Sequence, residues 1–300
     1  MSRSMVGTKK ATVFDKVKGF VCLVRPKQWI KNLFVFSALI FAKLVFEPAY
    51  LKTVFLAFLC FCMISSCVYI LNDIIDADND RLHPKKRTRP IASGLISKGE
   101  ALVFLAVLLP VAIISGFLLH MYFGLILLVY FINNILYSIA VKHMVILDVM
   151  SIAVGFLLRV IGGGVVIEVY ISQWILLCTL LLSLFLGFSK RRNELVVLEN
   201  GADSHRKILK EYSLEFIDNM LSIVTASTVM AYSLYTFSSK NNYFMMLTIP
   251  FVLYGIFRYQ YIIYMKKEGG SPEETVLSDI PLMLCIFLWV AISVIILYLG

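Results

Sequence analysis

Long apolar segments, separated by short polar stretches, run through almost the whole chain. A helix that crosses the hydrocarbon core of a bilayer needs about 20 predominantly apolar residues. Nine candidate segments lie near residues 31–47, 51–72, 99–118, 121–141, 145–167, 172–189, 215–238, 243–265 and 280–299. The first is short, so it is the one most easily tilted or broken. The pattern predicts an all-α, polytopic membrane protein with about nine transmembrane helices.

The distribution of basic residues predicts the orientation of these helices. Membrane proteins concentrate Lys and Arg in their cytoplasmic loops. If the N-terminus is cytoplasmic, only Lys43, Lys52 and Lys240 lie outside, Arg159 lies within a span, and all other Lys and Arg residues are cytoplasmic. We therefore expect a multi-pass protein of the cell membrane with a cytoplasmic N-terminus.

The same assignment divides the chain into a short arm and one membrane domain. Residues 1–30 form a basic cytoplasmic arm, with a short interfacial helix around residues 13–24, and residues 31–300 form a single transmembrane domain. The long, charged cytoplasmic loops are residues 73–98, 190–213 and 266–279. Because functional residues concentrate in loops held by a rigid scaffold, we expect a cytoplasmic active site among these loops.

The composition supports a membrane protein and argues against a nucleic-acid partner. Hydrophobic residues make up 60% of the chain and charged residues only 16%, whereas a soluble domain is about a quarter charged. The formal net charge of +9 reflects the basic cytoplasmic loops, so we expect membrane lipid rather than nucleic acid beside the protein. The sequence is compatible with a homo-oligomer.

An acidic cluster ends the second predicted span. Asn72, Asp76 and Asp80 are spaced four residues apart, which places them on one face of a continuing helix, and Asp73 joins them. Mg²⁺ prefers such oxygen ligands and takes its remaining ligands from water and substrate phosphates. We therefore predict a Mg²⁺ site that faces a diphosphate, with the ligands Asn72, Asp73, Asp76 and Asp80. The alternative is a solvated helix end, or one paired with the basic residues that follow.

A basic segment, residues 83–94, follows the acidic cluster. Basic side chains beside an acidic metal site suit a polyanion held between Mg²⁺ and Arg or Lys. Prolines stiffen the loop on both sides of Arg87 and Arg89, which favours phosphate binding by these arginines and by Lys86. Binding of lipid head groups is the alternative, and Lys85 with Lys86 would suffice for it.

At these residues the sequence resembles the UbiA superfamily of membrane prenyltransferases. The first signature of that family is Asn-Asp-x-x-Asp-x-x-x-Asp, which residues 72–80 match. Further stretches resemble the decaprenyl-phosphate phosphoribosyltransferase branch: residues 25–32, 80–94, 137–148, 155–164 and 190–195. The resemblance implies a nine-span bundle, a cytoplasmic active site and Mg²⁺-dependent chemistry. For the branch it implies transfer of phosphoribose from phosphoribosyl diphosphate to a polyprenyl phosphate.

The resemblance also implies roles for residues on later spans. Beside Asp73, Asp76 and Asp80, the implied catalytic residues are Tyr137 and Lys142, whose hydroxyl and ammonium groups would contact donor phosphates. An interfacial tyrosine and a snorkelling lysine are the alternative.

Two charged residues within the fifth span are further substrate-binding candidates, because intramembrane charges are usually functional or paired. We expect Asp148 to bond ribose hydroxyls or to pair with Lys142. Arg159 is expected to close the polar cavity or to bind an acid elsewhere.

The remaining substrate-binding candidates lie on the arm and on the third cytoplasmic loop. Where aromatic prenyltransferases carry a second Asp-rich motif, this chain has Lys190 and Arg191, which suit a second anionic substrate. Glu194 completes this group, although a helix salt bridge with Lys190 is an alternative. Lys27 and Lys31 would cover the site from the arm, and membrane attachment is their equal alternative.

Two other functions are open at this point. An ordinary prenyltransferase would take the diphosphate on the lipid and use a small acceptor, and the acidic cluster would serve it equally well. A membrane transporter would use Asp148 and Arg159 as coupling residues. The gathering of charge at one face and the lack of an inverted repeat in the sequence argue against a transporter.

Overall fold

The computed structural model describes residues 12–82, 86–199, 207–238, 243–266 and 270–299. These residues form helices joined by loops, with no strand among them. In chain order, the α-helices and 3₁₀ helices (η) are α1 Val13–Val24, η1 Pro26–Phe36, α2 Ser37–Phe41, α3 Pro48–Ile75, α4 Ala77–Leu82, η2 Lys86–Thr88, α5 Lys98–Leu119, α6 Met121–Ile139, η3 Val141–His143, α7 Leu147–Val165, α8 Gln173–Glu199, η4 Lys207–Glu211, α9 Leu214–Ser238, η5 Tyr243–Thr248, α10 Ile249–Tyr264, α11 Pro272–Ser278 and α12 Ile280–Leu299.

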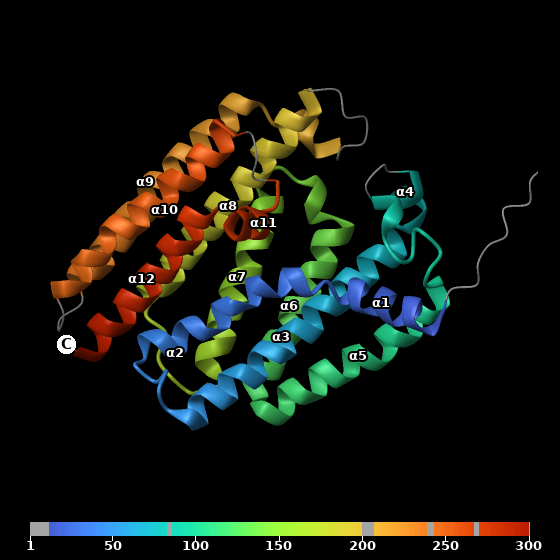
Figure 1. Cartoon of the computed structure of the whole chain (residues 1–300), viewed down its shortest axis with the longest axis horizontal. Coiled ribbons are helices and arrows are strands. Elements are labelled where there is room, and N and C mark those ends of the chain that lie inside the picture. The colour runs from blue at the N-terminus through green and yellow to red at the C-terminus, as the bar shows by residue number, and fades with distance from the viewer. Residues whose placement is uncertain (1–11, 83–85, 200–206, 239–242, 267–269, 300) are drawn as a thin grey trace, which may run out of the picture.

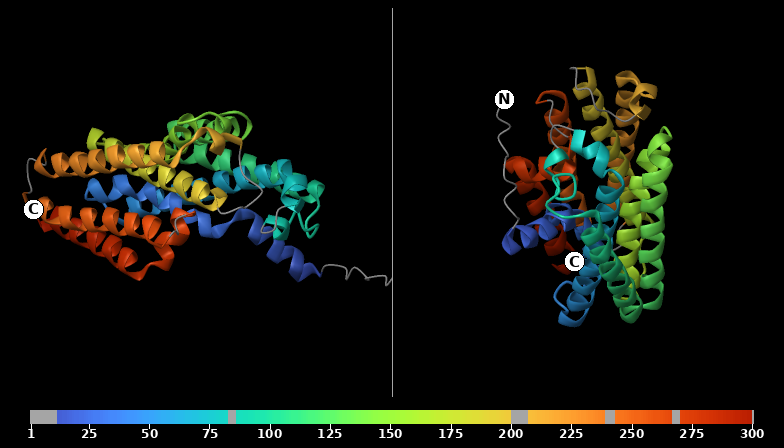
Figure 2. Two further views of the ribbon diagram at one scale, coloured as in Figure 1. Left: turned by 90° about the horizontal axis from the view of Figure 1, so that it is seen from above. Right: turned by 90° about the vertical axis from the view of Figure 1, so that its right-hand side faces the viewer.

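Within the described ranges, 8 helices are long and apolar enough to cross a membrane. They are α3, α5, α6, α7, α8, α9, α12 and the continuous stretch of η5 and α10. These helices coincide with the second to ninth predicted spans, so the prediction of an all-α polytopic protein is confirmed. Figures 1 and 2 show the long helices side by side along one common direction.

The first predicted span, residues 31–47, is not a regular transmembrane helix. The chain there is a 3₁₀ helix, η1, followed by the five-residue α2, and residues with positive φ (Arg25 at 50° and Lys43 at 60°) bound the segment. It nevertheless reaches along the bundle, because its far end meets α12, where the Val45 N–H donates to the Tyr298 hydroxyl at 2.8 Å. A 3₁₀ helix rises about 2.0 Å per residue, against about 1.5 Å for an α-helix, so a short segment covers a long distance.

Protein on several sides covers this irregular backbone, as irregular backbone at membrane depth requires. Asn32, Val35 and Leu39 are all at most 1% exposed. On α7, a β-carbon added to Gly163 would lie 1.9 Å from the carbonyl oxygen of Val35. Glycine at position 163 therefore allows the two backbones to touch.

Two hydrophobic cores lie on either side of α7. One core contains Val149 of α7 with Phe185 and Leu221 of α8 and α9. The other contains Phe61 of α3 and Phe123 of α6, whose rings meet edge to face at 5.7 Å. Helix α7 thus separates the two halves of the bundle and contacts both, which Figure 1 shows from its central position.

One end of the bundle gathers the charged loops. The helices α3, α6, α8 and α10 all end there, at Ile75, Ile139, Glu199 and Tyr264, and we call this end the loop face. Figure 1 shows their ends on the upper side, opposite the chain's C-terminus. The interfacial helix expected around residues 13–24 is α1, with a capping box formed by Thr12 and Asp15. Residues 1–11 of the predicted arm lie outside the described residues.

Helix α1 belongs to the loop face. The Lys16 ammonium lies 2.5 Å from Glu100 at the start of α5, and the rings of Phe20 and Phe104 meet at 5.1 Å. Helix α1 and the start of α5 are therefore neighbours.

Substitution of Gly163 by alanine should destabilise the protein. The added methyl group would collide with backbone that has no room to move, and overpacking of this kind costs about 1–3 kcal/mol. Thermal unfolding of the purified protein in detergent, followed by size-exclusion chromatography, measures the effect. Gly155→Ala is the matched control on the same helix, because its added methyl group meets no atom closer than 3.5 Å. Equal melting temperatures for the two variants would contradict the close contact at Gly163.

Candidate active site

The predicted acidic stripe forms at the loop end of α3. The helix ends at Ile75, Asp76 caps it, and α4 resumes at Ala77. The backbone N–H of Asp76 donates to the Asn72 carbonyl and that of Asp80 donates to the Asp76 carbonyl, both at 2.8 Å. The four-residue spacing therefore survives the break between the two helices.

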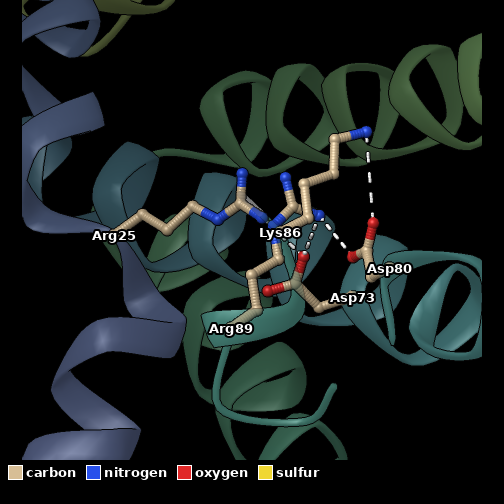
Figure 3. Close-up of polar contacts among 5 residues, drawn as sticks. All are labelled: Arg25, Asp73, Asp80, Lys86 and Arg89. Atoms are coloured by element: carbon tan, nitrogen blue, oxygen red, sulfur yellow. Dashed lines mark hydrogen bonds and ion pairs between the residues drawn. The ribbon is translucent and has the colours of Figure 1, made fainter. Parts of the chain in front are cut away.

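Two carboxylates of this stripe are buried and share one arginine. Asp73 and Asp80 are 2% and 3% exposed. One nitrogen of Arg89 lies 3.1 Å from Asp73 and 2.7 Å from Asp80, and the Lys86 ammonium lies 4.0 Å from Asp80 (Figure 3). Pairing with the basic residues that follow, which the sequence left as an alternative, thus occurs in the structure.

The oxygen donors of the acidic stripe suit Mg²⁺, although they do not form a complete coordination shell. In the part of the chain that the structure describes, no three His, Cys, Asp or Glu side chains gather closely enough to hold a metal. A single cationic nitrogen does bridge Asp73 and Asp80, so a cation fits between these two carboxylates. Mg²⁺ is commonly held by one or two carboxylates, with waters and phosphate oxygens completing the shell. Asn72 and Asp76, on the same stripe and partly exposed, are further oxygen donors.

Arg25 joins the cluster, and the sequence reasoning missed it. Its guanidinium lies 2.5 Å from Asp73 and 5.1 Å from the centre of the Tyr69 ring. The residue has a left-handed backbone conformation between α1 and η1, immediately before Pro26. Its position at the start of the stretch 25–32, which resembles the family branch, was the signal in the sequence that could have identified it. No spacing rule connects it with Asp73, which is 48 residues away.

The lysines of the arm take different positions. Lys31 lies 3.1 Å from the buried carboxylate of Glu273 in α11, and also donates to Gln28 at 2.7 Å. Burial alone would raise the pKa of Glu273, but the Lys31 ammonium and hydrogen bonds from backbone and Ser271 outweigh it and lower the pKa to about 2. Lys27 is exposed. Lys31 therefore ties the arm to α11.

The basic loop is only partly described. Arg87 is exposed on η2, next to Lys86. His83, Pro84 and Lys85, which belong to the motif quoted from the sequence, lie outside the described residues. Arg81 pairs with the exposed Asp78 at 3.0 Å and does not contact the acidic stripe.

A second charged cluster lies where α6, α7 and α8 meet the loop face. Arg191 is fully buried and donates to Asp148 at 2.6 Å, to the Tyr137 hydroxyl at 3.1 Å and to Glu194. Tyr212 donates to the other oxygen of Asp148 at 2.8 Å, and burial raises the pKa of Tyr212, so its hydroxyl stays protonated. The structure thus gathers predicted residues from three separate helices.

The partners within the second cluster differ from some expectations. Asp148 pairs with Arg191 and Tyr212 rather than with Lys142, because Arg191 projects from α8 directly against the start of α7. Since Arg191 already neutralises two carboxylates, its positive charge is not free for a second anion. Lys142 and Lys190 are both partly exposed nearby, on η3 and α8.

Arg159 is buried in a polar but uncharged network. It donates to the Asn32 side chain, the Gly155 carbonyl and the Tyr130 hydroxyl, each at 2.7 Å. Its guanidinium also lies 4.7 Å from the centre of the Tyr130 ring. The expected acid partner is not found among the described residues, and the contact with Asn32 instead ties α7 to η1.

Residues 33–290 match the model of the UbiA prenyltransferase family. The chain belongs to this family. The decaprenyl-phosphate phosphoribosyltransferase of Mycolicibacterium smegmatis is 31% identical over 290 residues, which cover 91% of each chain. The enzyme of the same name from Corynebacterium glutamicum is 32% identical over 282 residues, which cover 91% of this chain and 84% of that one.

Solved structures of UbiA proteins share the fold. A UbiA homolog from Archaeoglobus fulgidus bound to GPP and Mg²⁺ superposes with a TM-score of 0.71 over 93% of this chain and 99% of that one, at 19% identity. The resemblance to the UbiA superfamily and to its phosphoribosyltransferase branch is therefore confirmed. This UbiA protein is a multi-pass membrane protein, and its family supports transferase chemistry.

Removal of the Asp148 charge should destabilise this UbiA protein strongly. In the Asp148→Asn variant Arg191 would lose a charged partner at a fully buried position, and breaking a buried ion pair costs about 3–5 kcal/mol. The neighbouring pair of Arg192 with Asp218 is the control, because the Asp218 side chain is 36% exposed. Asp218→Asn should cost at most about 1 kcal/mol. Thermal unfolding in detergent compares the two, and an equal loss would contradict the burial of Asp148.

The pairing of Lys31 with Glu273 should produce a pH-dependent stability. Because the pKa of Glu273 falls from 4.5 to about 2 in the folded protein, its contribution is complete above pH 4.5 and disappears as the pH falls towards 2. A shift of this size corresponds to about 3 kcal/mol. Melting curves of the wild type and Glu273→Gln should differ at pH 7 and converge in that acid range. A gap that stays constant with pH would contradict the ionised pair.

Proposed function

We propose that this UbiA protein is a Mg²⁺-dependent phosphoribosyltransferase. It transfers 5-phosphoribose from phosphoribosyl diphosphate to a polyprenyl phosphate of the decaprenyl type and releases pyrophosphate. The observation that carries the proposal is the buried carboxylate pair of Asp73 and Asp80, bridged by one cationic nitrogen and surrounded by arginine and lysine. Relatives that align with about nine-tenths of the chain carry the name of this activity.

The acidic stripe and its basic neighbours form the donor site. Asn72, Asp73, Asp76 and Asp80 would hold Mg²⁺, which supplies positive charge to the departing pyrophosphate. Lys86, Arg87 and Arg89 bind the diphosphate oxygens from the loop that follows. A metal site lined by basic side chains matches a diphosphate, because the carboxylates alone would repel it.

The reaction needs no strong general base. The bond between C1 of the ribose and the diphosphate oxygen breaks, and an oxygen of the lipid phosphate bonds to C1 from the opposite side, with inversion. That oxygen is already ionised near neutral pH, because the second pKa of a phosphate monoester is about 6. The work of the protein is therefore to orient two anions and to offset their repulsion.

Residues of the second cluster orient the two phosphate groups. The Tyr137 hydroxyl accepts a hydrogen bond from Arg191, which holds it at the loop face, where it would contact a phosphate. Lys142 and Lys190 supply positive charge from partly exposed positions. Asp148, Glu194 and Arg159 act through the residues that they position, since the first two hold Arg191 and the last holds Asn32.

The membrane determines from which side each of the two substrates reaches the site. Long apolar helices keep the chain within the bilayer, where the isoprenoid tail of the lipid phosphate also lies. The basic residues at the loop face orient that face towards the cytoplasm. The soluble sugar donor then enters from the cytoplasm, and Lys27 on the exposed arm lies on the same side.

Transfer of a prenyl group from a prenyl diphosphate is the second candidate. A UbiA structure of the same fold holds GPP and Mg²⁺. The two functions differ in which substrate carries the diphosphate, and a single assay separates them. Purified protein in detergent is incubated with Mg²⁺, radiolabelled phosphoribosyl diphosphate and polyprenyl phosphate, and label is counted in the organic phase. Label there supports the proposal, whereas transfer only from a prenyl diphosphate to an aromatic acid overturns it.

Loss of a predicted metal ligand should abolish this transfer. We expect Asp80→Asn and Asp76→Asn to lower the rate by roughly a hundredfold or more, as does the loss of a group that offsets charge in a transition state. Asp78→Asn is the matched control, because Asp78 is exposed on α4 and its ion pairs within the described residues are with Arg81 and Lys98. Rates of organic-phase labelling are compared after size-exclusion chromatography confirms intact protein. Full activity in both ligand variants would disprove the metal site.

A further inference from the structure

Arg25 and Arg89 neutralise the two buried carboxylates of the acidic stripe. Arg25 lies 2.5 Å from Asp73, and Arg89 contacts Asp73 at 3.1 Å and Asp80 at 2.7 Å. Figure 3 shows both guanidinium groups beside the Asp73 carboxylate, where they contact the same oxygen, and Arg89 also reaches Asp80. Two positive charges thus occupy the space beside the oxygens that would bind a divalent cation.

The cations of this cluster are more exposed than the acids. Asp73 and Asp80 project from helix ends and have side chains 2% and 4% exposed, whereas those of Arg25 and Arg89 are 27% and 28% exposed. Neither arginine lies within an α-helix. Arg25 has a left-handed backbone conformation in the connection between α1 and η1. Long side chains on such segments can leave a carboxylate without any rearrangement of the bundle.

The charges balance only if the arginines exchange partners. Without metal, Arg25 and Arg89 offset Asp73 and Asp80, and Lys86 adds a further positive charge 4.0 Å from Asp80. A divalent cation brings two further positive charges, which at this distance repel both guanidinium groups. A diphosphate brings enough negative charge to receive them, and arginine matches its oxygens in a bidentate geometry.

We propose that Arg25 and Arg89 are exchangeable counterions: they hold Asp73 and Asp80 in the metal-free protein and pass to the diphosphate when metal and diphosphate bind together. Metal alone must displace them without compensation, so it binds weakly. Metal with diphosphate binds strongly, because the displaced arginines gain new partners. The inference deepens the proposed function and rests on it only for the diphosphate class of ligand.

If the exchange occurs, Arg25 lowers the affinity of the protein for the metal alone and raises its affinity for the diphosphate. Loss of its charge removes a competitor of the metal and also removes a phosphate ligand. A purely structural role, in which Arg25 only ties the arm to α3, predicts that both affinities fall together. The sign of the change in metal affinity therefore separates the two roles.

The test uses full-length protein in detergent with Mn²⁺ as an EPR-visible probe. Mn²⁺ alone is titrated first, and binding of radiolabelled inorganic pyrophosphate is then measured at saturating Mn²⁺. We expect Arg25→Gln to bind Mn²⁺ more tightly and pyrophosphate more weakly, each by roughly 5- to 150-fold, the range typical of coupled binding events. Unchanged or weaker Mn²⁺ binding in this variant overturns the proposal.

Three further variants make the result specific. Arg81→Gln removes the same charge from the same end of the bundle, but Arg81 pairs with Asp78, so neither affinity should change. Asp80→Asn should abolish Mn²⁺ binding, which assigns the signal to this site. Arg25→Lys keeps the charge and loses the bidentate geometry. It should raise the Mn²⁺ affinity and lower the pyrophosphate affinity, as in Arg25→Gln, but by smaller factors. This variant replaces Arg25→Gln in the test if Arg25→Gln does not fold.

Failure of the proposed function gives a different result. If the opposite shifts appear but no phosphoribose is transferred, the counterion exchange stands and the proposed substrates are wrong. If phosphoribose is transferred but Mn²⁺ affinity does not rise in Arg25→Gln, the exchange alone is wrong.

Discussion

The contact between η1 and α7 is the constraint on which both ends of the site depend. The carbonyl oxygen of Val35 lies against Gly163, and Arg159 of the same helix donates to Asn32. These contacts place an irregular segment inside the bundle, where its backbone is shielded from lipid. Because this segment is fixed there, Arg25 at its N-terminal end lies beside Asp73. Lys31 within the segment reaches Glu273 in α11.

The two charged clusters at the loop face differ in how far water reaches them, and this difference gives them separate roles. In the first cluster the acids are buried and the cations are partly exposed, so ligands can replace the cations. In the second cluster Arg191 and Asp148 are both fully buried. Separating Arg191 from Asp148 would leave an unpaired charge in a low-dielectric environment, which is energetically costly. The pair is therefore a rigid support for Tyr137. A cluster whose cations are open to exchange therefore lies in the same bundle as a cluster whose ion pair is fixed by burial.

Much of the site was accessible from the sequence because its signals are local. Asn72, Asp73, Asp76 and Asp80 follow helical spacing, and the structure preserves that spacing across the break at Asp76. Arg25 was missed, because its partner Asp73 is more than 40 residues away. For Asp148 the sequence left ribose hydroxyls or Lys142 as partners, and the structure instead pairs it with Arg191, which is also more than 40 residues away. No periodicity connects residues on different helices. The same limit left two expectations open for Arg159, an acid partner or a place at the end of the polar cavity, whereas its partners are an amide, a carbonyl and a hydroxyl.

The sequence by itself determined the all-α membrane class, eight of the spans, the acidic stripe and the family, since hydrophobic length, helical spacing and motifs are properties of neighbouring residues. Only the tertiary structure decided that the first span is an irregular segment lodged against Gly163. It also decided which cation neutralises which acid. Those choices depend on helix packing, which sets the distance between side chains, and on burial, which determines how strongly each charge needs a partner.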